Sequence, residues 1–294
     1  MSKKYIGVDQ MLDDIFFNLS AVDFLNIFGL VVLSVLLSMY FAIFLADRSG
    51  RTPLPILDAP DPMEAAYLSG GLSQVIRTLI YDLDERGFIL LANEGRIKIT
   101  NKLLVSDEIG ELETRLLEKI KSSPKIQEIF DDQSLREDLN RLLTPVRARL
   151  GLENLLLSPK VLNVRRAAEI LGSLTILLFG GVKAKLLVDA GQSNISYLLF
   201  LIIASIASVY ALGYVLTRNV ASRRGRLHVE AMRSHFADQL EATIAQIRSP
   251  GPGARAFSGA ALYLIGLYGL SILKGTTESK FAEAFDGVAG DGDE

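Results

Sequence analysis

Two long apolar stretches without a charged residue dominate the hydrophobic pattern of the chain. They cover residues 27–46 and 195–216. With a rise of ~1.5 Å per residue, a helix of about twenty residues crosses the ~30 Å hydrocarbon core of a bilayer. A signal peptide would have a shorter apolar region and a small-residue cleavage site, whereas the first stretch ends in an acidic and a basic residue. We therefore predict transmembrane helices over residues 21–46 and 195–217.

Two further apolar stretches are less uniform. The stretch over 167–188 has Glu169 near its start and Lys183 and Lys185 near its end. Because lysine side chains can extend to the membrane surface, we predict a second span here, paired with the next as a hairpin; a buried soluble helix is the alternative. The stretch over 257–273 is apolar on every face but barely long enough to cross a bilayer. It is a fourth span, a re-entrant segment or a helix packed on others.

The chain between the first and second spans has the pattern of a folded domain. Residues 47–62 are rich in proline and predict an extended linker. A short helix then ends at Gly70 and Gly71, and apolar spacing predicts a second helix over 72–86. Two short strands follow. Helix, turn, helix and hairpin is the order of a winged helix, and residues 108–161 repeat it more weakly.

The predicted fold class is a mainly α membrane protein with three transmembrane helices, or four, and a cytoplasmic α+β domain of tandem winged-helix-like units. A cytoplasmic amphipathic helix and an acidic, flexible tail follow the third span. The expected segments are an N-terminal segment 1–20, spans 21–46, 167–188 and 195–217, a linker 47–62, a winged-helix-like domain 63–166, an amphipathic helix 218–249, the 257–273 stretch and the tail 275–294.

Basic residues near the spans predict the topology. Lysine and arginine gather on the cytoplasmic side of membrane proteins. We therefore place residues 47–166 in the cytoplasm and the N-terminus outside, in a bacterial inner or internal membrane, although Lys183 and Lys185 would then lie near the outer face. The basic residues expected at the membrane interface are Arg165, Arg166, Arg218, Arg223, Arg224 and Arg226.

The amino-acid composition excludes several kinds of functional site. The chain has no cysteine, which excludes disulfides, thiolate nucleophiles and cysteine-held metals. Residues 47–166 hold 18 Lys and Arg against 19 Asp and Glu, a net of 18 − 19 = −1, so we expect no nucleic-acid binding. His228 and His235 are seven residues apart, which does not match a metal pair, and we expect both on a solvated helix face. We predict no catalytic, cofactor-binding or metal-binding residues.

A motif after the first span carries a family resemblance. It combines a proline-rich link, a YLSGG segment, a helix and an Arg-Gly pair. This pattern resembles a family of uncharacterised bacterial membrane proteins, to which LFGGVKAKLL and SRRGRLHVEAMR are also similar. Many members end in a Gly/Cys-rich tail that is absent here, and the resemblance implies an architecture but no activity. The motif residues are Asp61, Ala66, Tyr67, Leu68, Gly70, Gly71, Arg86 and Gly87.

These observations favour a non-enzymatic function. We expect a membrane-anchored interaction or regulatory protein that recruits a partner through its cytoplasmic domain. Its partners would be membrane lipids and a protein that the sequence does not identify, with oligomer formation left open. The alternatives are a subunit of a membrane transport or secretion assembly and, third, an enzyme acting at the lipid interface.

Overall fold

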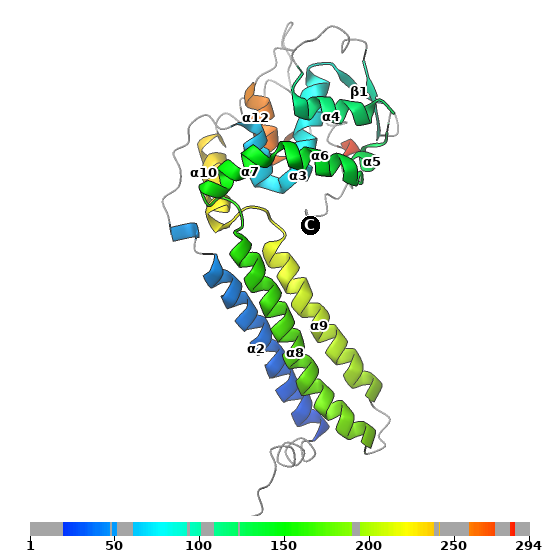
Figure 1. Ribbon diagram of the computed structural model, residues 1–294, viewed down its shortest axis with the longest axis vertical. Coiled ribbons are helices and arrows are strands. Elements are labelled where there is room, and N and C mark those ends of the chain that lie inside the picture. Colours follow the sequence, from blue (N-terminus) through cyan, green and yellow to red (C-terminus); the bar gives the residue numbers. More distant parts are fainter. Residues whose placement is uncertain are drawn as a thin grey trace, which may run out of the picture. The chain divides into compact units, whose positions relative to one another are not determined.

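The protein is mostly helical and divides into two units (Figure 1). Unit 1 is residues 1–48 and 159–217, and unit 2 is residues 49–158 and 218–294. The structure is a computed structural model. It describes residues 20–47, 49–51, 61–92, 95–100, 109–122, 124–189, 195–237, 241, 259–273 and 283–285.

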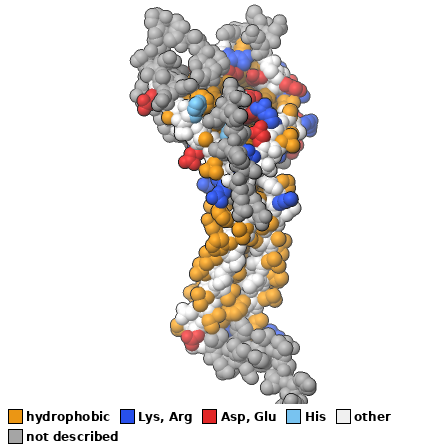
Figure 2. Space-filling view, turned by 90° about the vertical axis from the view of Figure 1, so that its left-hand side faces the viewer, with side chains coloured by type: hydrophobic (Ala, Val, Ile, Leu, Met, Phe, Trp, Pro, Cys, Tyr) orange, Lys and Arg blue, Asp and Glu red, His pale blue; other side chains and the backbone are white. Residues whose placement is uncertain are grey.

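Unit 1 contains three helices that are long and apolar enough to cross a membrane. They are α2 (Ala21–Ala46), α8 (Pro159–Asp189) and α9 (Ile195–Thr217). Large hydrophobic side chains remain exposed along all three (Figure 2), as expected of surfaces that face lipid. The prediction of three membrane-crossing helices is confirmed at this level. Helix α8 begins eight residues before the predicted span, because Pro159 suits the first turn of a helix and no breaker follows.

Small residues allow the three helices of unit 1 to pack closely. A Cβ atom at Gly180 would lie 2.6 Å from the Ile202 side chain on α9 and 3.3 Å from the Phe28 ring on α2. A Cβ atom at Gly172 would lie 2.7 Å from Val35. Helices in a membrane gain little from the hydrophobic effect and associate through such close van der Waals contacts.

The Lys183 side chain, which the sequence predicts to extend to the membrane surface, packs on an aromatic ring near the start of α2. It is only 8% exposed, and its ammonium nitrogen lies 5.6 Å from the centre of the Phe24 ring. Phe24 stacks in turn on Phe28 and Phe179. A cation held over an aromatic face loses less on leaving water than an isolated one, which explains its position inside the bundle.

Helix α3 (Pro62–Glu85) is the centre of unit 2. Asp61 caps it, because its carboxylate accepts a hydrogen bond of 2.9 Å from the Met63 N–H, and Pro62 occupies the first turn. The helix is broken at Gly70 and Gly71, where the sequence predicted the end of a short helix. Seventeen of the 24 residues of α3 are buried, so the remaining elements of unit 2 are arranged around it.

The winged-helix prediction is not confirmed. The hairpin exists: β1 (Ile89–Ala92) pairs antiparallel with β2 (Arg96–Ile99). After α7 the described chain forms a single bridge, from Leu156 to Ala221, before it enters α8, and no second hairpin. The helices between the hairpin and that bridge are α4 (Glu111–Ile120), α5 (Ile126–Phe130), α6 (Gln133–Leu142) and α7 (Thr144–Leu152).

The last apolar stretch packs inside unit 2. It forms α12 (Gly259–Tyr268) and a short 3-10 turn, η4 (Leu270–Leu273), and α12 lies against α3. Ten residues are too few to cross a bilayer, and Leu264, Ile265 and Leu267 are at most 1% exposed. The sequence left open a fourth span, a re-entrant segment or a helix packed on other helices, and the structure shows the packed helix.

The segments after α9 differ in extent from those predicted. Helix α10 (Arg223–His235) is the start of the amphipathic helix expected over 218–249, and most of the remainder lies outside the described residues. Of the tail, residues 283–285 are described, and Phe285 is 6% exposed in the core of unit 2. The proline-rich residues 52–60 also lie outside the described part.

Candidate functional site

The first half of the YLSGG motif packs α3 against α12. Ala66 is fully buried, and Tyr67 and Leu68 are 4% and 5% exposed. A Cβ atom at Gly266 of α12 would lie 2.8 Å from the Pro62 carbonyl oxygen and 3.4 Å from the Ala66 Cβ. The two backbones therefore approach each other at a point where both helices carry a small residue.

The two glycines of the motif make the bend in α3. Gly71 has φ +63° and ψ −156°, a conformation that side chains with a Cβ rarely adopt. Directly after the bend, the buried Gln74 amide donates a hydrogen bond of 2.8 Å to the Ile265 carbonyl oxygen of α12. The bend allows the second half of α3 to continue along α12 while this buried polar group keeps a partner.

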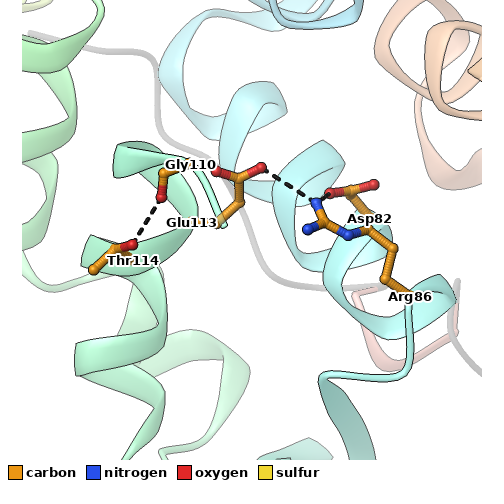
Figure 3. A network of polar contacts seen from close by, with 5 residues as sticks. All are labelled: Asp82, Arg86, Gly110, Glu113 and Thr114. Atoms are coloured by element: carbon orange, nitrogen blue, oxygen red, sulfur yellow. Dashed lines mark hydrogen bonds and ion pairs between the residues drawn. The ribbon is translucent and has the colours of Figure 1, made fainter. Parts of the chain in front are cut away.

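Arg86 joins the end of α3 to the first turn of α4 (Figure 3). Its Nη1 atom lies 2.9 Å from the Asp82 carboxylate and 3.5 Å from that of Glu113, and its guanidinium lies over the Phe88 ring. Gly87, at φ +73°, then reverses the chain into the hairpin. The Arg-Gly pair thus ends a helix and holds the next one in place.

Two carboxylates beside Arg86 have perturbed acidities. Burial raises the pKa of Asp82, while Arg86 opposes that increase. Burial, followed by repulsion from Glu85, raises the pKa of Asp84 to about 6. Perturbed carboxyls can mark catalytic sites, but among the described residues no three His, Cys, Asp or Glu side chains are grouped to hold a metal ion there. The motif residues therefore have structural explanations.

A second cluster of polar contacts lies where the three chain connections between the units meet. We call it the junction, and it lies within unit 2. Two extended segments pair there: the Leu157 N–H donates to the Val220 carbonyl oxygen (2.9 Å), and the Ser222 N–H donates to that of Leu155 (2.8 Å). The junction comprises residues 49–50, 153–157 and 220–225.

The SRRG segment builds most of the junction. The Ser222 hydroxyl caps α10 by accepting from the Gly225 N–H and donates to the Asn154 carbonyl oxygen at 2.7 Å. Arg224 donates through its side chain to the Glu153 carbonyl oxygen (2.5 Å) and through its backbone to the Ser49 hydroxyl (3.2 Å). Arg224 therefore joins the connection after α2 to the connection before α8.

Gly225 is required at this position for space. A Cβ atom there would collide with the Leu155 carbonyl oxygen, which already accepts the hydrogen bond from Ser222. By contrast, Gly151 in α7 has nothing within 4 Å of the same position. Only the first of these two helical glycines is fixed by tertiary packing.

His228, behind the junction, is not on a solvated face as the sequence predicted. It is 7% exposed, and its Nδ1 atom is buried with no hydrogen-bond partner among the described residues. Burial lowers its pKa, and Arg224 lowers it further against an opposing effect of Glu153. His228 is thus favoured in its neutral form. His235 is exposed and contacts the edge of Phe236.

The predicted interfacial arginines do different things. In unit 1, Arg165 pairs with Glu169 on the next turn of α8 (2.7 Å) and donates to the Thr217 hydroxyl of α9 (2.6 Å). In unit 2, Arg224 belongs to the junction. Arg165 and Arg224 therefore make contacts within the protein. Of the six predicted arginines, those with exposed side chains are Arg166, Arg218, Arg223 and Arg226.

Sequence reasoning did not identify Ser222, Gly225 or Gln74 as important, although a Ser directly before a helical segment is a capping signal. Within the described ranges, no three His, Cys, Asp or Glu side chains are grouped to hold a metal ion. A scan against protein-family models, a search of curated proteins and a search of solved structures each found no match.

Proposed function

We propose that this protein is a non-enzymatic, membrane-anchored interaction protein whose unit 2 binds a protein partner at the cytoplasmic face of a bacterial inner membrane. The N-terminus and the α8–α9 turn would lie outside. The single observation that carries the proposal is that unit 2 contains chain from both sides of the α8–α9 hairpin, with its three connections fastened in the junction.

One covalent link is enough to keep a domain at a membrane. In this chain three connections lead into unit 2, and they are hydrogen-bonded to one another within it. A compact domain that is tethered at several points suits a protein that presents a binding surface beside a membrane.

The use of polar residues in unit 2 also supports a binding function. Gln74 and Arg233 bond to carbonyl oxygens of α12, Arg86 bonds to two helices, and Arg224 bonds to two connections. These polar groups hold elements together and do not converge on a shared space where a substrate would react.

The proposed orientation, with unit 2 in the cytoplasm, is based on exposed arginines that are close in sequence to the ends of α8 and α9 leading into unit 2. These arginines are Arg166, Arg218, Arg223 and Arg226. An arginine near an anionic membrane surface contributes about 1 kcal/mol of electrostatic attraction to that surface.

A subunit of a membrane transport or secretion assembly is the second candidate. It is favoured by the outward side chains of α2, α8 and α9, which leave a broad apolar surface for other membrane helices as well as for lipid. Leu174 and Ile203, for example, are 47% and 67% exposed.

Photo-crosslinking from the intact chain in cell membranes separates the two candidates. A photoreactive amino acid would replace Leu90 or Leu152, which are 61% and 84% exposed in unit 2, or Leu174 or Ile203 in unit 1. We expect protein adducts from the unit 2 positions and lipid adducts from unit 1. Protein adducts from unit 1 alone would support the assembly subunit and refute the proposal.

Cysteine labelling tests the orientation, since the chain has no cysteine of its own. A membrane-impermeant reagent added outside should label Asp189→Cys, at the exposed end of α8, and spare Leu90→Cys. The reverse pattern would place unit 2 outside the cell.

A further inference from the structure

The described residues of the acidic tail, 283–285, place one aromatic side chain in the core of unit 2. Phe285 is 6% exposed and meets the Phe130 ring of α5 edge to face, with ring centres 6.2 Å apart and planes at 83°. Ala284 beside it is partly buried against the same core, while Glu283 is exposed. Among the described residues of the tail, Phe285 therefore makes the most deeply buried contact.

The surface that receives Phe285 combines apolar and basic groups. The Arg77 guanidinium carbon lies 5.3 Å from the centre of the Phe130 ring, and Phe130 itself is only 3% exposed. Of the two carboxylates that follow Phe130, that of Asp132 pairs with Lys119, whereas that of Asp131 accepts from the neutral Gln127 amide, which carries no compensating charge. The Phe130 ring therefore suits an aromatic partner, and the Arg77 guanidinium over it suits a negative charge beside that partner.

The tail has the matching chemistry. Residues 275–294 contain six acidic residues against one lysine, and Glu283 and Asp286 flank the Ala284-Phe285 pair. Charge and ring therefore both complement the Arg77–Phe130 surface.

The free energy gained by burying the Phe285 ring is small enough for the docked segment to be displaced by a competing peptide. Burial of one phenylalanine side chain corresponds to roughly a 10- to 100-fold preference for the docked state. Ordering of the docked residues reduces that preference. Removal of the segment would uncover one aromatic surface while the body of the core, built on α3, stays in place.

We propose that the Arg77–Phe130 surface is a binding site for an acidic partner peptide with one aromatic residue, and that the chain's own residues 283–285 occupy it until such a peptide displaces them. The inference rests on the proposed function in one respect, that unit 2 recruits a protein. It adds the surface and the chemistry of the partner.

The test uses the detergent-solubilised chain truncated after Lys274 and a fluorescent peptide of residues 278–294. We expect this peptide to bind the truncated chain at least about tenfold more tightly than a matched Phe285→Ala peptide does, since one buried ring is worth that factor. Binding to the intact chain should be weaker, because the tethered segment competes at an effective concentration on the order of millimolar. Equal binding of the two peptides, or equal binding to the two chains, would overturn the proposal.

A second measurement does not depend on truncation. In the intact chain, 4-fluorophenylalanine at position 285 should give a ¹⁹F resonance that moves to its free-peptide position as several millimolar of the unlabelled peptide is added. A resonance that stays in place would contradict exchange.

The outcomes separate this inference from the proposed function. Protein adducts from Leu90 or Leu152 without peptide binding would remove only the inference. Peptide binding without any protein adduct from unit 2 would leave the docking site and remove the proposed function.

Discussion

Replacement of Gly225 by alanine tests whether the junction holds unit 2 together. The added Cβ would collide with the Leu155 carbonyl oxygen, so one of the two backbones must move. That movement breaks the hydrogen bond from the Ser222 N–H and strains the one between Leu157 and Val220. Each is worth about 1 kcal/mol, and a polar group left buried without a partner costs about 1–3 kcal/mol.

Alanine is also a better helix former than glycine, by about 0.5–1 kcal/mol, which offsets part of this loss. The net expectation is a decrease of about 2 kcal/mol in the free energy of unfolding. For a unit of this size, 1 kcal/mol corresponds to about 2–4 °C, so the unfolding temperature should fall by about 4–8 °C.

Gly151→Ala is the matched control. It gains the same helix propensity, has open space around the new Cβ and should raise the unfolding temperature by about 1–4 °C.

A fluorogenic thiol reagent can follow both variants in one background. Ser73→Cys places a nearly isosteric thiol at a position that is 4% exposed, in a chain without other cysteines. The reagent then reports when α3 becomes accessible on heating. An unfolding temperature for Gly225→Ala equal to or above that of Gly151→Ala would refute the role assigned to the junction.

Four further predictions can be tested, the first two of them in the same Ser73→Cys background. Because the folded pKa of Asp84 is raised to about 6, its contribution to stability is present below about pH 4 and lost as pH rises through 6, so Asp84→Asn should raise the unfolding temperature at pH 7.5 but not at pH 4. The hydrogen bond from Lys119, together with that from the Leu135 N–H, lowers the pKa of Asp132. Asp132→Asn should therefore lower the unfolding temperature at pH 7.5 and leave it unchanged well below pH 4. If the two variants responded to pH in the same direction, the opposite pKa shifts of Asp84 and Asp132 would be contradicted. Glu169→Leu leaves the Arg165 charge without its partner and should cost about 3–5 kcal/mol against unfolding in SDS, whereas the double variant with Arg165→Met should recover most of that loss; a double variant as unstable as the single one would exclude the pairing as the cause. Gly266→Ala should separate α12 from α3 and increase thiol labelling of a Leu264→Cys variant at native temperature, and unchanged labelling would show that α12 tolerates the added methyl group.

The hydrophobic pattern was sufficient to place the three long helices of unit 1, apart from the start of α8, because lipid acts on each helix separately. A span needs length and continuous apolarity, and both are local properties of the sequence. The bounds of α2 and α9 therefore coincide with the predicted 21–46 and 195–217. The interruption at Gly70 and Gly71 was predicted for the same reason, since a glycine stop depends on a few neighbouring residues, whereas the cap at Asp61 was not predicted.

Only the tertiary structure decided what the remaining apolar and polar residues do. Residues 257–273 have a composition suited to lipid, to re-entry or to a protein core, and the α3 surface that accepts α12 lies almost two hundred residues away in sequence. Local pattern likewise could not show that the 222–225 segment pairs with residues before α8, that Lys183 lies on Phe24, or that Phe285 docks on Phe130. The physical reason is common to all of these: local sequence sets what a segment can bury, whereas the partner that buries it is fixed by close packing between distant parts of the chain.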